Sequence, residues 1–145
     1  MKKLILAFAL AALSASASLA DPIADRQAIM KATGKAIGSI VPIAKGEAPF
    51  DAAAVAAAFA TINENVQKID VSAMFPAGSD TGDTTASPKI WEDMAGFQAA
   101  VDKYKADVAA AAAANPADLA AFQAQFGAVT KNCGACHEVY RIKKG

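Results

Sequence analysis

The last helix of the chain can be predicted from residues 119–140, which read LAAFQAQFGAVTKNCGACHEVY. The larger apolar side chains in this stretch recur at steps of three and four residues, the spacing of one helical face. This stripe consists of Leu119, Phe122, Phe126, Val129, Cys133, Cys136 and Tyr140. The pattern predicts an amphipathic helix that turns both cysteine sulfurs towards the interior of a helical protein.

Three further segments indicate helices, and no strand pattern or repeat accompanies them. Two have clean stripes: Val55, Phe59, Ile62, Val66 and Ile69 in one, and Ile90, Met94, Phe97, Val101, Tyr104 and Val108 in the other. A looser first helix places Ile23, Met30, Ile37 and Val41 on one side, with Gly34 and Gly38 between them. Single apolar stripes on four helices predict an all-α fold, an antiparallel four-helix bundle in one domain.

Turn and capping residues set the expected helix boundaries. Asp51 is suited to cap the second helix, and Ser87 with Pro88 is expected to start the third. Asn115 with Pro116 repeats the same device before the last helix. The polar stretch MFPAGSDTGDTTA at 74–86 predicts a long loop between the second and third helices.

The first residues, MKKLILAFALAALSASASLA, have the composition of a secretory signal peptide. A basic start is followed by a short apolar run and then by small residues that a signal peptidase accepts. We therefore expect a signal peptide at 1–20 and an exported domain at 21–145, periplasmic in a Gram-negative bacterium. No later stretch is apolar and long enough to predict a membrane span.

Charge excludes one class of function. Without Lys2 and Lys3 the chain has 12 basic and 14 acidic side chains. This balance is not that of a nucleic-acid-binding protein. The lysines near the C-terminus, at 131, 143 and 144, could meet an acidic patch on a partner or simply be solvated.

Cys133, Cys136 and His137 form a C-x-x-C-H motif that contains every cysteine and histidine of the chain. A zinc site needs four ligands, and these are only three candidates. A thioredoxin-like pair needs a neighbouring strand, and a disulfide across so small a loop would add little stability. In an exported protein the motif predicts covalent attachment of one haem c, with His137 as the proximal iron ligand. The alternative is a helical bundle without haem, with a disulfide between the two cysteines.

The opposite side of the iron has no second histidine available. Methionine, a less usual ligand or no ligand at all could take that position. The candidates are Met30, Met74 and Met94. Met94 belongs to a core stripe and Met74 lies beside the loop, whereas Met30 is one turn before Gly34, which leaves room for a flat ligand. Spacing alone leaves Met30 open between iron ligand and core residue.

The chain resembles the cytochrome c′ family, four-helix c-type cytochromes with the haem motif near the C-terminus. The resemblance lies in RQAIM at 26–30, FPAGSD at 75–80, SPKIW at 87–91 and CGACHEVYR at 133–141. High-spin members commonly have leucine or phenylalanine where this chain has Met30. The resemblance implies the low-spin branch with Met30 as the second axial ligand. It also implies that Arg26 lies near the haem propionates.

These expectations lead to a periplasmic electron carrier rather than an enzyme, because no acid–base group is evident beside the distal position. Burial of the haem among Phe59, Phe97, Phe122 and Phe126 is expected to favour ferrous iron. Its partners would be redox proteins of the periplasm, and the protein could be a monomer or a homodimer. The alternative is a high-spin protein with an open iron that binds nitric oxide or carbon monoxide.

Overall fold

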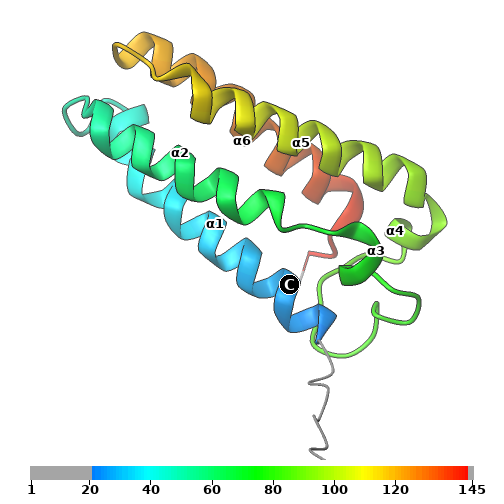
Figure 1. Cartoon of the computed structure of the whole chain (residues 1–145). Coiled ribbons are helices and arrows are strands. Elements are labelled where there is room, and N and C mark those ends of the chain that lie inside the picture. Colours follow the sequence, from blue (N-terminus) through cyan, green and yellow to red (C-terminus); the bar gives the residue numbers. More distant parts are fainter. Residues whose placement is uncertain (1–20, 144–145) are drawn as a thin grey trace, which may run out of the picture.

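The computed structural model describes residues 21–143, and its main elements are four long helices. They are α1 (Pro22–Ala44), α2 (Ala52–Gln67), α5 (Met94–Ala114) and α6 (Leu119–Tyr140). Helix α1 packs on α2, α2 on α5, α5 on α6, and α6 returns to α1. Figure 1 shows these helices side by side with alternating directions. The predicted antiparallel four-helix bundle is confirmed.

The apolar stripe predicted for α2 forms the centre of the core. Val55, Phe59, Ile62 and Val66 are at most 1% exposed. Phe97, Val101 and Val108 of α5 are buried against them, as are Phe122 and Val129 of α6. Burial of one face of each helix is what holds the bundle together, since most helical stability in proteins comes from packing of an apolar face rather than from intrinsic propensity.

The face of α1 that was predicted to point inward is not the one buried in the core, although its Met30 and Ile37 line a cavity. The buried side chains of α1 are Arg26, Ile29, Thr33, Ala36, Ile40 and Ile43. Met30 is 42% exposed, and Ile23, Ile37 and Val41 are only half-buried. The prediction failed because α1 has two apolar rows, and the row through Ile29 and Ile40 is the one buried in the core.

Of the predicted helix starts, the one at Asn115 is wrong, and the one at Ser87 holds only for a short helix, in which the Ser87 hydroxyl accepts from the Lys89 N–H at 3.2 Å. Ser87 and Pro88 precede only the short helix α4 (Lys89–Glu92), after which Asp93 leaves the helical conformation and caps α5 through a 3.0 Å bond from the Gly96 N–H. Asn115 ends α5 in the left-handed region at φ 42°, and Asp118 caps α6. The prediction for Asp51 is confirmed, since its carboxylate accepts from the Ala54 N–H at 3.0 Å.

A long connection closes one end of the bundle. Residues 75–88, which we call the strap, run from the short helix α3 (Val71–Met74) to α4. Figure 1 places the strap at the end of the bundle where α1 begins and α6 finishes. Three segments that are far apart in sequence therefore meet there, and this end contains the candidate site.

The opposite half of the bundle holds most of the phenylalanines. The ring of Phe122 lies 6.3 Å from that of Phe50, 6.0 Å from Phe59 and 5.6 Å from Phe126, measured between centroids. Phe97 instead stacks edge-on with Phe75 and with Tyr140 at 4.7 and 5.1 Å. The apolar residues are thus divided between a packed core and the wall of a cavity.

Candidate functional site: a cavity with thiols, imidazole and thioether in its walls

A cavity of about 590 Å³ opens between α1, α5, α6 and the strap. Its size lies within the range of small-molecule and cofactor sites, and its walls are mostly apolar. Ile90 and Phe97 line it from the α4–α5 side, followed along α5 by Val101 and Tyr104. Of the four phenylalanines expected around a haem, only Phe97 is in this wall, so the prediction for Phe59, Phe122 and Phe126 is wrong.

Helix α6 brings the whole motif to the cavity. Cys133, Cys136 and His137 all line it, because steps of three and four residues return to the same helical face. Both cysteines are free thiols and half-buried. The predicted convergence of the two sulfurs and the imidazole on one patch is therefore present in the structure.

Met30 lines the same cavity from α1. Met74 and Met94 are half-buried, pack against the hydrophobic core and are not part of the cavity wall. Among the described residues, Met30 is thus the methionine that the cavity offers as a second ligand. Its 42% exposure is that of a side chain on a cavity wall rather than of a core residue.

The cavity walls change the acid–base behaviour of the motif. Burial raises the pKa of both thiols; the neighbouring Cys133 charge adds to the effect at Cys136, whereas a hydrogen bond from Tyr104 opposes it at Cys133. Burial, with a contribution from the Arg141 charge, lowers the pKa of His137. Both effects favour the neutral imidazole, the form in which it binds a metal.

These residues fit a covalently attached haem. The donor set is two thiols, an imidazole and a thioether on facing helices, and the remaining wall is apolar. Gly34 also lines the cavity, and a Cβ built there would meet nothing within 4 Å, so its side of α1 is open to a flat ligand. Among residues 21–143, no cluster of three or more His, Cys, Asp and Glu side chains could hold a metal ion instead.

Two polar residues in the cavity wall were not found by sequence reasoning. Thr33 is 4% exposed, and its hydroxyl has no hydrogen-bond partner among the described residues. The sequence pattern shows Tyr104 only as part of an apolar stripe, yet burial raises the pKa of its phenol well above the ordinary value. Neither could have been recognised from spacing, since both occupy ordinary positions on a helical face.

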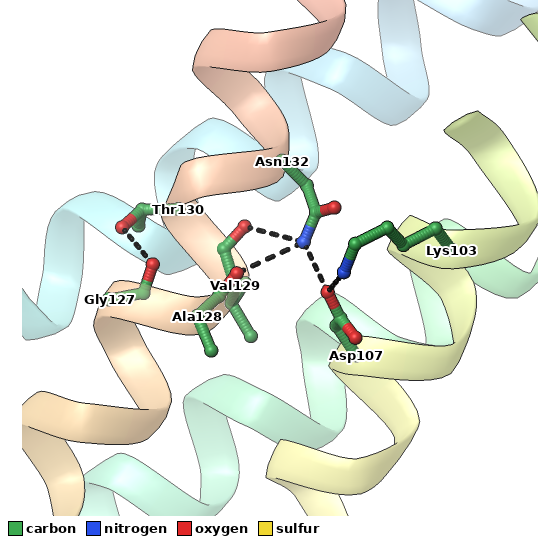
Figure 2. Close-up of polar contacts among 7 residues, drawn as sticks. All are labelled: Lys103, Asp107, Gly127, Ala128, Val129, Thr130 and Asn132. Carbon is green, nitrogen blue, oxygen red and sulfur yellow. Dashed lines mark hydrogen bonds and ion pairs between the residues drawn. The ribbon is translucent and has the colours of Figure 1, made fainter.

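A polar contact joins α5 and α6 immediately before the motif, as Figure 2 shows. The amide of Asn132 donates to the Asp107 carboxylate at 2.8 Å and to the Ala128 carbonyl at 3.0 Å. Lys103 forms an ion pair with the same carboxylate. Because Asn132 precedes Cys133, this contact fixes the position of the motif's first turn relative to α5.

Comparisons with known proteins agree with this site. Residues 21–141 match the family model described as Cytochrome C'. A cytochrome c′ from Rhodopseudomonas palustris is 45% identical over 125 residues, covering 86% of this chain and 84% of the relative. A cytochrome c-556 from Agrobacterium fabrum is 40% identical over 125 residues, again covering 86% and 84%.

Solved structures give the same result. A cytochrome c′ from Rhodopseudomonas palustris has a TM-score of 0.79 at 43% identity, covering 87% of this chain and 99% of that one. A nitric oxide complex of a variant cytochrome c prime from Alcaligenes xylosoxidans has a TM-score of 0.75 at 34% identity, covering 86% and 95%. The fold and the site define a four-helix haem protein of the electron-transfer type. This chain belongs to the cytochrome c′ family.

Family membership confirms the resemblance and the expected cofactor, one covalently attached haem c. Members of the family are generally not enzymes. Within residues 21–143 no helix is both long and apolar enough to cross a bilayer. The predicted signal peptide at 1–20 lies outside the described residues, as does Lys144.

Proposed function

We propose that this chain is a periplasmic electron carrier with a low-spin haem held between Met30 and His137. Cys133 and Cys136 anchor the haem through thioether bonds, and His137 is the proximal ligand. The observation that supports Met30 most directly is its place on the α1 wall of the cavity whose α6 wall carries the motif. Met74 and Met94 have no such place.

The bound haem would supply one-electron exchange. Met30 would supply a thioether, a soft ligand that favours ferrous iron and so raises the reduction potential. Ile90, Phe97 and Val101 would exclude water from one wall, which disfavours the extra charge of the oxidised state. Ligation from two facing helices would keep the coordination the same in both oxidation states, so that little rearrangement accompanies electron transfer.

Export, partners and assembly belong to the same proposal. The first 20 residues direct the chain to the periplasm and are removed there. Its partners are redox proteins of that compartment, and it acts as a monomer or a homodimer. Mass spectrometry of the exported protein tests the first point, because cleavage before Asp21 and one attached haem together fix its mass. Sedimentation analysis of the same sample distinguishes a monomer from a homodimer.

A second function is supported by one feature of the site. Met30 is 42% exposed, so a small ligand could displace it from the iron. The relative from Alcaligenes xylosoxidans described as a nitric oxide complex shows that a protein with this fold can bind such a ligand. The alternative is therefore a cytochrome c′ with an open iron that binds nitric oxide or carbon monoxide.

Visible spectra of the purified protein distinguish the two functions. They are recorded in both oxidation states, with and without carbon monoxide. Sharp low-spin bands on reduction, a weak sulfur-to-iron band on oxidation and no prompt change with carbon monoxide are expected for Met30–His137 ligation. Broad high-spin bands that change at once with carbon monoxide would refute the electron-carrier proposal in favour of gas binding.

A further inference from the structure

Arg26 is a buried cation that is hydrogen-bonded to the strap and to Met74, the residue just before the strap. Its side chain is 6% exposed, although arginine is seldom fully buried. Nη1 donates to the Met74 carbonyl and to the Ser79 hydroxyl, both at 3.0 Å. Nη2 donates to the Thr84 hydroxyl at 2.8 Å and to the Ser79 carbonyl. The guanidinium also lies 5.0 Å from the centre of the Phe75 ring, measured from Cζ.

These contacts use the hydrogen-bonding fork of Arg26 almost completely. A guanidinium has five N–H groups, and the two Nη atoms carry four of them. The four bonds go to the strap and to the Met74 carbonyl just before it, and none of them uses the Nε–H. Burial lowers the pKa of Arg26, while the charges of Asp21 and Asp80 raise it, and arginine stays protonated. The paired donors that would grip a propionate are therefore already in use.

The strap is fixed at its other side by the end of α6. The Ser87 N–H donates to the Tyr140 carbonyl at 3.0 Å, and the Ile142 N–H donates to the Thr85 carbonyl at 2.8 Å. Ala86 and Arg141 form an isolated antiparallel bridge between these bonds. The start of α1 and the end of α6 thus hold the strap from two sides.

The strap is part of the cavity wall next to Met30. Thr84, Thr85 and Ala86 line the cavity, as does Arg26. Gln27, the neighbour of Arg26, adds a 2.6 Å bond from its amide to the Asp83 carbonyl. Because Arg26 is one helical turn before Met30, the same turn of α1 carries both the strap contacts and the proposed ligand.

We infer that Arg26 is a positioning residue that holds the strap against α1 and so restricts displacement of Met30 by small ligands. The Met30 part of this inference rests on the proposed function. Arg26 then acts through neutral acceptors of the chain, the carbonyls of Met74 and Ser79 and the hydroxyls of Ser79 and Thr84. The role implied by the family resemblance is that of a charge partner for the propionates. In that role Arg26 does not depend on the Ser79 and Thr84 hydroxyls, so only removal of its charge would have an effect.

A double-mutant cycle on the haem-containing protein separates the two roles. One variant is Arg26→Gln, the second combines Ser79→Ala with Thr84→Val, and the third contains all three changes. The second keeps the Arg26 charge but removes two of its acceptors. Lys35→Gln is the matched control, since Lys35 is an exposed cation of α1 outside the cavity wall. The measurements are the rate of protease cleavage within the strap and the association rate of carbon monoxide.

If Arg26 holds the strap, the Ser79/Thr84 variant raises both rates at least about thirtyfold, because the two hydrogen bonds to Arg26, of about 1 kcal/mol each, are lost together with the bonds that the same hydroxyls form within the strap. Arg26→Gln raises them at least as much, the triple variant adds little further, and Lys35→Gln leaves both unchanged. If only Arg26→Gln has an effect, the inference is overturned and the residue acts through its charge. If wild-type spectra are high-spin, the Met30 part fails with the proposed function, while the cleavage rates still decide whether Arg26 holds the strap.

Discussion

Among single residues, three on the α1 wall of the cavity have different constraints. Met30 is partly exposed, Thr33 is buried, and Gly34 has no side chain. They follow within little more than one helical turn, so they form one surface facing the motif on α6. The thioether is the proposed iron ligand of this surface, and Gly34 leaves space beside it. Two predictions concern Met30 and Thr33 directly.

Met30→Leu removes the thioether but keeps an apolar side chain of similar volume. We expect the reduced protein to become high-spin and to bind carbon monoxide promptly, because no other methionine lines the described cavity. Stability of the fold should change by less than about 1.5 kcal/mol, as for other volume-conserving exchanges. Visible spectroscopy and urea unfolding of the same samples measure both. A low-spin reduced spectrum in Met30→Leu would show that Met30 is not the ligand.

Thr33→Val replaces a buried hydroxyl that has no partner among the described residues. Removing such a group while keeping its shape should leave the free energy of unfolding unchanged or raise it by up to about 1 kcal/mol. The matched control is Thr130→Val, because the Thr130 hydroxyl donates to the Phe126 carbonyl at 2.8 Å. That variant should lose stability in urea unfolding. A comparable loss in Thr33→Val would mean that its hydroxyl has a partner.

At the scale of elements, the position of α6 against α5 is set partly by a polar contact beside the motif. Asp107 of α5 accepts from Asn132 at 2.8 Å and pairs with Lys103, one turn earlier on its own helix. The hydrogen bonds from Lys103 and Asn132 lower the pKa of Asp107. Its carboxylate therefore contributes more to the folded state when it is ionised.

Asp107→Asn should lower the free energy of unfolding by about 1 kcal/mol at neutral pH, because one charge-assisted bond to Asn132 and the ion pair are lost. A depressed pKa stabilises the fold above the unfolded value of about 3.9 and loses this effect as pH falls through the folded value. The difference between wild type and variant should therefore vanish in acid. Urea unfolding between neutral pH and acid measures it, and a difference independent of pH would exclude the charge as its source.

At the scale of the whole molecule, the bundle has two halves with different tasks. One half is filled by Phe50, Phe59, Phe122 and Phe126. The other half contains the cavity, with the strap across its end. Packing in the first half can hold the four helices in place while the second leaves room for the haem. Stability and ligation should therefore be separable by mutation.

Phe122→Ala tests this separation, because Phe122 is 0% exposed and lies at the centre of the aromatic cluster. We expect a loss of about 3–5 kcal/mol in the free energy of unfolding, as for other buried aromatic truncations. The visible spectrum of the folded variant should stay that of the wild type. Phe97→Ala, in the cavity wall, is the comparison and should change the spectrum as well. A changed spectrum in Phe122→Ala would mean that the two halves are coupled.

Local sequence patterns were enough to predict the class of the fold and to recognise a haem-attachment motif. Helical period is a local property, so the stripes on α2, α5 and α6 could be read without knowledge of their partners. The same holds for Cys133, Cys136 and His137, whose spacing places them on one helical face. Met30 could be named as a candidate, but spacing alone did not separate it from Met74 and Met94.

The buried row of α1 could be identified only from the tertiary structure, which also shows that Arg26 and Thr33 of this row line the cavity together with Met30. The tertiary structure also decided that Arg26 bonds to groups 48 to 58 residues away, and that Asp93 breaks the third predicted helix. Phe59 and Phe97 belong to similar stripes, yet one is in the packed core and the other in the cavity wall. Such differences depend on how helices stack and where the strap crosses them, and these long-range contacts leave no trace in local periodicity.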